Sequence, residues 1–248
     1  MIGKKFFTVP LLSQLRNIKT IRHISMVPFN VQSLGISILE QKDISYLDSI
    51  LLGRDGLPKV VSYNDIKNVP NTDISLWCVN NAVYQIATFE LIEFLRNEIG
   101  NHSAIEICSG YGHVGRSLGI PITDSYMQTR PEIEVHYASL NQKTIHPPED
   151  VLKMEATVAV DHFNPDIVIG CFATHKWQPG DKNGSDFGVN EEYILEKVKK
   201  FIHIGNEKTH ESKRILKIPH KSIKFPWLVS RAIDQSKNVI WIWEMQPC

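Results

Sequence analysis

One short stretch of the chain combines a carboxylate with a glycine-rich turn, a pattern that can bind a charged ligand. The apolar run at residues 104–108 contains Glu106 and leads into a turn with Gly110, Gly112 and Gly115. When a strand ends in such a turn and a helix follows, free backbone N–H groups gather at the carboxyl edge of the sheet, where open α/β folds bind ligands. The glycine spacing also matches the dinucleotide fingerprint, which is a weak signal by itself.

The positions of two acids separate the candidate ligands. A dinucleotide site has a wholly apolar strand before the turn, and its ribose-binding acid lies about 20 residues after the first glycine. Here Glu106 lies inside the strand, and Asp124 follows Gly110 by only 14 residues. A carboxylate beside the turn would repel a pyrophosphate, but it would attract a cofactor that carries an ammonium and a sulfonium group. The acids therefore favour S-adenosylmethionine over NAD, and an NAD-dependent oxidoreductase is the weaker alternative.

The segment at residues 106–112 resembles the cofactor motif of the class I S-adenosylmethionine-dependent methyltransferases, in which small residues and glycines follow an acid. The resemblance covers roughly residues 84–206. It implies that S-adenosylmethionine is the cofactor and that residues of this motif hold it. These residues are Glu106, Ser109, Gly110 and Gly112.

The resemblance also assigns roles to residues at the ends of the next strands. In this family the second strand ends in an acid that binds both ribose hydroxyls, a role that would fall to Asp124. The third strand ends in an acid and a small residue that meet the adenine, and Glu155 and Ala156 resemble that pair. The fourth strand forms the wall between cofactor and acceptor, and it ends near Cys171 and Phe172.

The chain departs from the family pattern in three places. Cys108 replaces the first glycine of the turn, which is tolerable if its side chain packs inward. Only 11 residues separate Gly112 from Asp124, so either the first helix is short or Asp124 is not the ribose acid. The fourth strand lacks the Asn/Asp-Pro-Pro-aromatic signature, which disfavours adenine, cytosine N4 and glutamine amides as acceptors.

Two histidines are candidate catalytic residues, because the ordinary pKa of histidine lies near working pH. His175 follows the fourth predicted strand and would face the reacting methyl group, and His203 lies at the same edge after the fifth strand. Each has an alternative interpretation as a histidine of a solvated loop. Methyl transfer depends mainly on in-line positioning, since the sulfonium is already activated, so the sequence supports the cofactor more firmly than the acceptor.

The pattern of apolar residues indicates the elements that position these groups. Apolar residues at helical spacing from Val83 onward predict a long helix that ends at Ile99, with Gly100 as its cap, and similar patterns predict two further helices. Short β-branched runs between them predict strands, and alternating strands and helices indicate a parallel sheet. The last two apolar runs predict an antiparallel hairpin. The predicted strands are 104–108, 120–124, 151–154, 166–171 and 201–205; the further helices are 156–163 and 190–200; the hairpin runs are 225–232 and 238–243.

These elements predict an α/β fold, namely a Rossmann-like, mostly parallel sheet with helices on both faces and a C-terminal antiparallel hairpin. Residues 81–248 would form this domain. Residues 1–80 lack a long periodic segment and would form an N-terminal cap or extension, with one short helix at 44–52. Together with an insertion at 125–150, they would cover the substrate side.

Composition excludes several classes of protein. The chain has 248 residues, 42% of them hydrophobic, with 27 basic and 27 acidic side chains, which excludes intrinsic disorder. It contains no run of about 18 apolar residues, so we expect no membrane span, and we interpret the N-terminus as mature protein. The scattered cysteines predict free thiols in a cytoplasmic protein and no metal site. They are Cys78, Cys108, Cys171 and Cys248.

The neutral total conceals an uneven distribution of charge. Residues 1–39 carry five basic side chains and no acid, and residues 207–224 carry six basic side chains and two acids. From the resemblance we expect a methyltransferase that acts on a small-molecule acceptor, and the two basic segments make an anionic acceptor one option. Two alternatives stay open. One is a non-catalytic protein that binds S-adenosylmethionine as a sensor or scaffold, and the other is a nucleic-acid-modifying protein, against which the pI of about 7.1 argues.

Overall fold

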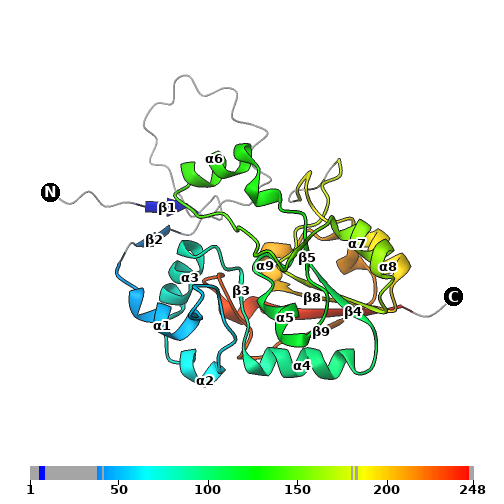
Figure 1. The fold of residues 1–248 in the computed structure, drawn as a ribbon, viewed down its shortest axis with the longest axis horizontal. Helices are drawn as coiled ribbons and strands as arrows, with labels where there is room; N and C mark the ends of the chain where they lie inside the picture. The colour runs from blue at the N-terminus through cyan, green and yellow to red at the C-terminus, as the bar shows by residue number, and fades with distance from the viewer. Residues whose placement is uncertain (1–5, 9–37, 41, 180, 182–183, 246–248) are drawn as a thin grey trace.

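The computed structural model describes residues 6–8, 38–40, 42–179, 181 and 184–245 (Figure 1). The described part of the chain is a mixed α/β structure built around a five-stranded sheet with the order β4-β7-β8-β11-β9. The bounds of these strands are Ala104–Ile107 for β4, Ile167–Cys171 for β7, Lys200–Asn206 for β8, Asn238–Glu244 for β11 and Lys221–Ile223 for β9.

The directions of these strands bring several loops to one edge of the sheet. Strands β4, β7 and β8 are parallel, and β11 is antiparallel to both β8 and β9. Strand β9 therefore runs in the same direction as β8. The loops that follow β4, β7, β8 and β9 all leave the sheet at the same edge, which we call the carboxyl edge.

A parallel pair of short strands continues the sheet beyond β4. Strands β5 (Thr123–Asp124) and β6 (Leu152–Lys153) pair with each other. The backbone N–H of Glu106 donates to the carbonyl of Pro121 at 2.9 Å, and that of Ser109 donates to the carbonyl of Thr123 at 3.0 Å. Since β5 is parallel to β4, Asp124 also lies at the carboxyl edge.

Helices pack on both faces of the sheet (Figure 1), because the strand side chains alternate. Helices α4 (Phe89–Ile99) and α5 (His113–Leu118) pack with strand residues such as Ile169 and Ile202 on one face. Helices α7 (Ala156–Phe163) and α8 (Glu191–Lys197) pack with residues such as Ile107 and Phe201 on the other face. Side-chain caps fix two of these helices, since Thr88 accepts from the N–H of Leu91 and Asn190 accepts from that of Tyr193.

Residues 42–83 form a helical unit with its own apolar cluster beside the sheet. It contains the 3₁₀-helix η3 (Ser45–Leu47) and the helices α1 (Asp48–Leu51), α2 (Tyr63–Ile66) and α3 (Asn71–Asn80). The indole N–H of Trp77 donates to Asp48 at 2.8 Å and joins α3 to α1. Strand β3 (Gln85–Ile86) then pairs with β10 (Val229–Ser230), and this pairing ties the unit to the loop after β9. Two further short strands, β1 (Phe6–Thr8) and β2 (Ile38–Glu40), pair with each other.

The remaining short elements lie in connections. The loop between β5 and β6 holds the 3₁₀-helix η4 (Met127–Thr129) and helix α6 (Pro131–Ser139). After β8 come α9 (Glu207–His210) and η5 (Arg214–Lys217), and η6 (Gln235–Lys237) precedes β11. Within the described residues, no helix has both the length and the apolar character that crossing a membrane requires.

Two elements differ from the prediction. The run at 238–243 forms β11, but its antiparallel partners are β8 and β9 rather than the run at 225–232. That run contains Pro226, and the side chain of Asn238 donates to the carbonyl of Leu228, which holds the segment off the sheet. The helix that ends at Ile99 begins only at Phe89, because β3 occupies residues 85–86 before the Thr88 cap.

Candidate functional site

The turn after β4 adopts an alternating left-handed conformation. Cys108, Gly110 and Gly112 have φ angles of 52°, 54° and 70°. Cys108 therefore adopts the backbone conformation that a glycine would take most easily, at a cost of about 1–2 kcal/mol for a residue with a side chain. Its side chain packs against the apolar cluster below α7, as the sequence requires if this replacement is to be tolerated.

Asp124 lies directly against this turn. Its Oδ2 accepts a hydrogen bond from the N–H of Gly110 at 3.0 Å, and its Oδ1 accepts from the N–H of Tyr126 at 2.8 Å. Burial raises the pKa of Asp124, and the two N–H donors oppose that shift. The structure thus brings together Asp124 and Gly110, two of the predicted cofactor residues, while the ribose contact itself stays a prediction.

The short interval between Gly112 and Asp124 reflects a short helix. Helix α5 has six residues and ends at Leu118, because the next residue, Gly119, has a left-handed φ of 71°. The sequence left two explanations open, a short first helix or a ribose acid other than Asp124, and the structure has the short helix. The position of Asp124 therefore gives no reason to move the ribose role elsewhere.

Glu106 faces away from the carboxyl edge, toward α5. It is 1% exposed, and its Oε2 accepts a hydrogen bond from the N–H of Gly115 at 2.8 Å. Burial raises its pKa to about 8. A Cβ on Gly115 would lie 2.7 Å from that Oε2, so the glycine permits the close approach. Glu106 holds the start of α5 from inside the protein, and direct contact with a cofactor stays a prediction.

Ser109 forms the middle of the turn and is also buried. Its carbonyl accepts from the N–H of Gly112 at 2.8 Å, which closes the turn. Within the described part of the chain, its hydroxyl has no hydrogen-bond partner. A buried hydroxyl without a partner is uncommon, so Ser109 has hydrogen-bonding capacity that the fold does not use.

The other predicted cofactor residues lie at the ends of β6 and β7. Glu155 is exposed at the N-terminus of α7 and makes no side-chain capping bond, whereas Ala156 is buried. Cys171 is half-buried at the end of β7, and burial raises its pKa well above the ordinary range. Phe172 follows with a φ of 54°, and its ring contacts that of His210 edge-on.

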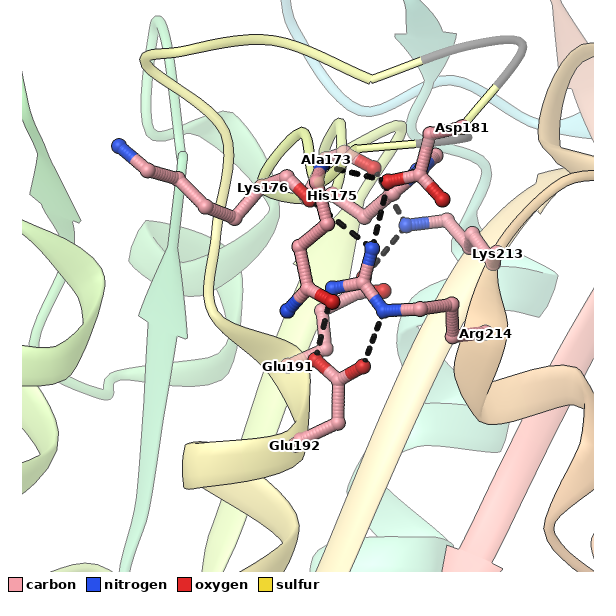
Figure 2. Close-up of polar contacts among 9 residues, drawn as sticks. Ala173, His175, Lys176, Asp181, Glu191, Glu192, Lys213 and Arg214 are labelled. Carbon is pink, nitrogen blue, oxygen red and sulfur yellow. Dashed lines mark hydrogen bonds and ion pairs between the residues drawn. The ribbon is translucent and has the colours of Figure 1, made fainter.

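His175 belongs to a partly buried network of polar side chains that we call the ion-pair cluster (Figure 2). The cluster is completed by residues of α8 and of the segment around η5, and its members are His175, Asp181, Glu191, Glu192, Lys213 and Arg214. Lys213 and Glu191 form an ion pair in which neither side chain is exposed by more than 1%. Arg214 lies between Glu192 and Asp181, at 2.6 Å from each carboxylate, and His175 Nε2 lies 3.7 Å from Asp181.

The second candidate base, His203, lies inside the protein. It is in the middle of β8 with 0% exposure, and its ring stacks on Trp241 at 5.7 Å between centroids. Burial, with the charge of Lys213, lowers its pKa well below the ordinary range. Neither ring nitrogen has a hydrogen-bond partner within the described residues. His175 is also 4% exposed, so both histidines are interior groups rather than solvated ones, although His175 lies in the loop after β7.

The basic segment at 207–224 is largely neutralised by acids. Beyond Lys213 and Arg214, Lys221 pairs with Glu244 at 3.0 Å and Lys224 pairs with Glu207 at 2.8 Å. The basic segment at 1–39 lies mainly outside the described residues. The structure thus gives most charges of the second segment a structural partner.

Sequence reasoning missed a set of polar residues that gather above the glycine turn. Ile145 lies against Gly110, and its N–H donates to Gln128 at 2.8 Å. Gln128 donates in turn to the Tyr84 hydroxyl at 3.4 Å, and that hydroxyl lies 3.1 Å from the hydroxyl of Tyr137. These residues come from the segment before α4 and from the loop between β5 and β6. No local motif marks such a set, because its members are far apart in the sequence.

Comparisons with known proteins add little to this geometry. No family model matches the chain, and neither does any curated protein. Among solved structures, the chain is similar to the crystal structure of Thermoplasma acidophilum 1320, with 13% identity over 71% of this chain and 95% of that one, at a TM-score of 0.31. A likeness at this level carries no argument about fold or function. Within the described residues, no group of three or more potential metal-ligating side chains is found.

Proposed function

We propose that the carboxyl edge around the glycine turn binds S-adenosylmethionine and that the protein transfers its methyl group to an acceptor. One observation carries this proposal: three left-handed residues alternate at the end of β4, and the carboxylate of Asp124 lies against them from the end of β5. A left-handed turn of this kind lets backbone approach a ligand closely, and the neighbouring acid can accept from ribose hydroxyls.

The order of the strands supports the same location. The strands lie side by side in the order β6-β5-β4-β7-β8. If they are numbered in chain order, with β4 as the first and β8 as the fifth, this spatial order is 3-2-1-4-5. This order reverses between β4 and β7, and doubly wound sheets bind their ligands outside the carboxyl ends at that reversal. The glycine turn and Phe172 follow these two strands. We therefore propose a Rossmann-like arrangement with a nucleoside cofactor bound at this reversal.

The charges around the turn suit a cationic cofactor better than a pyrophosphate. Asp124 lies against the turn, and Glu155 is exposed at the next strand end. Each carboxylate oxygen of Asp124 accepts a hydrogen bond from a different backbone N–H, and each keeps a lone pair for a ligand hydroxyl. The Ser109 hydroxyl is a further group that the fold leaves unused.

The chemistry that we propose depends on positioning rather than on a side-chain base. The cofactor supplies an activated methyl group when it is bound, so the chain has to hold the acceptor in line with it. His175 and His203 are buried against the ion-pair cluster and Trp241. We therefore assign them a role in supporting β8 and the loop after β7, and we place no proton transfer on them.

Isothermal titration calorimetry with S-adenosylhomocysteine tests the proposal. We expect the purified chain to bind it, and Asp124→Ala to weaken binding by about 1.5–3 kcal/mol, or roughly 10- to 150-fold, through loss of charged hydrogen bonds. Asp161→Ala is the matched control, since it removes an exposed carboxylate on α7 whose partners among the described residues are Tyr193 and Lys197. No binding at millimolar ligand would refute the proposal, and unchanged affinity in Asp124→Ala would refute the ribose role of Asp124.

A further inference from the structure

The loop between β9 and β11 brings an arginine to the carboxyl edge. Strand β9 runs parallel to β8, so residues 224–237 leave the sheet at the same edge as the glycine turn. Within this loop the backbone N–H of Arg231 donates to the carbonyl of Tyr84 at 3.0 Å, one residue before β3. This bond fixes the backbone of Arg231 beside the polar residues above the turn.

The side chain of Arg231 is held by neutral groups. Its guanidinium carbon lies 4.4 Å from the centroid of the Tyr84 ring, and its Nη2 donates to Gln142 Oε1 at 3.3 Å. Arg231 is half-buried, and it forms no ion pair with any carboxylate of the described residues. By contrast, Arg116 and Arg214 each form an ion pair with an acid at 2.7 Å or less. Arg231 is thus a partly desolvated cation without an anion from the described chain.

A continuous set of contacts links Arg231 to the proposed cofactor site. Its partner Tyr84 accepts from Gln128, Gln128 accepts from the N–H of Ile145, and Ile145 packs on Gly110 of the turn. Tyr84 also lies near Tyr111 of the turn. Burial raises the pKa of Tyr111, and Tyr84 adds to that increase. Arg231 is therefore linked to the glycine turn through three residues in contact with one another, Tyr84, Gln128 and Ile145.

We propose that Arg231 binds an oxyanion of the methyl acceptor, so that the acceptor is a small molecule with a carboxylate or phosphate group. That the bound ligand is the methyl acceptor rests on the proposed function, whereas the anion site itself rests on its own geometry. A guanidinium presents a planar fork of donors that matches both oxyanions, and a ring beneath it keeps the fork in one orientation. Partial burial strengthens the attraction, because water screens the charge less.

The two tyrosines complete the site chemically. The hydroxyls of Tyr84 and Tyr137 lie 3.1 Å apart, so one can donate to the other and leave a donor for a ligand. Burial, together with Tyr84, raises the pKa of Tyr137, which keeps its hydroxyl protonated and hence able to donate. The site thus combines a cation, phenolic donors and aromatic faces, a combination that suits an aromatic acid or an aryl phosphate better than a neutral ligand.

Calorimetry with benzoate, phenyl phosphate and benzamide tests this inference, with and without saturating S-adenosylhomocysteine. We expect at least one of the two anions to bind at least 10-fold more tightly than neutral benzamide. The ratio of the affinities for benzoate and phenyl phosphate then identifies the preferred oxyanion. Arg231→Gln should lower the affinity for the anion roughly 10- to 150-fold, the range for hydrogen bonds to charged groups. Arg96→Gln, an equal change of charge at an exposed position on α4, should leave it unchanged.

The results separate this inference from the proposed function. Loss of anion binding in Arg231→Gln with unchanged S-adenosylhomocysteine affinity supports the inference. Anion binding without any S-adenosylhomocysteine binding supports the anion site and refutes the proposed cofactor. Equal binding of benzamide, no binding of either anion, or equal anion affinity in Arg231→Gln overturns the inference. If Arg231→Gln does not fold, Arg231→Lys replaces it: it keeps the charge but loses the fork, so at least threefold weaker binding is expected and unchanged binding overturns the inference.

Discussion

Two polar regions lie beyond the carboxyl ends of the parallel strands, and they satisfy their polar groups in different ways. In the ion-pair cluster each charged group has an opposite charge from the chain, as in the pairs of Lys213 with Glu191 and of Arg214 with Asp181. Around the glycine turn, the described partners of Asp124 are two backbone N–H groups, and Arg231 contacts Tyr84 and Gln142. A cluster that satisfies itself stabilises a fold, whereas charges without an opposite charge are available to a ligand.

The largest effect is expected in the ion-pair cluster. Lys213→Met leaves Glu191 buried without its cation, which should lower the free energy of unfolding by about 3–5 kcal/mol in urea titrations. Lys221→Met is the matched control, since its pair with Glu244 is exposed and should be worth less than about 1 kcal/mol. Equal losses in the two variants would contradict the assignment of the ion-pair cluster to stability.

The next effect concerns Glu106 and appears as a dependence of stability on pH. Its pKa is about 8 in the folded chain against an ordinary value of 4.5, so between these values the folded state binds more protons than the unfolded state. The free energy of unfolding should therefore fall as pH rises, by about 2 kcal/mol between about pH 6.5 and 8 from this group. Glu106→Gln should remove that slope in urea titrations across this range. Glu93→Gln, at an exposed position on α4, should follow the wild type.

A smaller effect tests the conformation of the turn. Gly112 and Gly119 both have a positive φ, but a Cβ on Gly112 would lie 2.7 Å from Ile122 Cδ1, whereas one on Gly119 would meet nothing within 4 Å. Gly119→Ala should cost about 1 kcal/mol for its backbone conformation alone. Gly112→Ala should cost about 1–2 kcal/mol more, because steric overlap adds to the same backbone term. Thermal unfolding measures the difference, and equal costs would show that the turn is less tightly packed than described.

The smallest effect on stability is expected at Glu155. It is exposed and makes no capping bond, so Glu155→Ala should change the free energy of unfolding by less than about 0.5 kcal/mol. If Glu155 meets the adenine of the cofactor, the same variant should weaken S-adenosylhomocysteine binding several-fold in calorimetry. Unchanged affinity would remove Glu155 from the site and leave Asp124 as its main acid.

The sequence predicted the elements well where local signals were strong. Strands β4 and β7 and helix α7 lie at the predicted residues, because β-branched runs between turn residues and apolar helical spacing are local properties. The direction in which Glu106 points could not be predicted. All residues of β4 are buried, since helices cover both faces of the sheet, and such a strand shows no alternation that would separate its two sides.

The candidate site was predictable only in part, for a similar reason. The turn and Asp124 were found because they follow strands directly along the chain. His203 was placed at the edge, but β8 extends to Asn206 and keeps His203 in the middle of the strand. Tyr84, Tyr137 and Arg231 meet only through tertiary contacts between distant segments, and nothing local in the sequence marks them.

The position of β11 has a consequence for how the chain folds during synthesis. The last strand of the sheet in sequence is inserted between β8 and β9, so β9 has no partner in the sheet until residues 238–244 leave the ribosome. Until then the long apolar edge of β8 is unpaired, and exposed edges of this kind associate with other chains. Truncation before β11 should therefore cause aggregation rather than a gradual loss of stability.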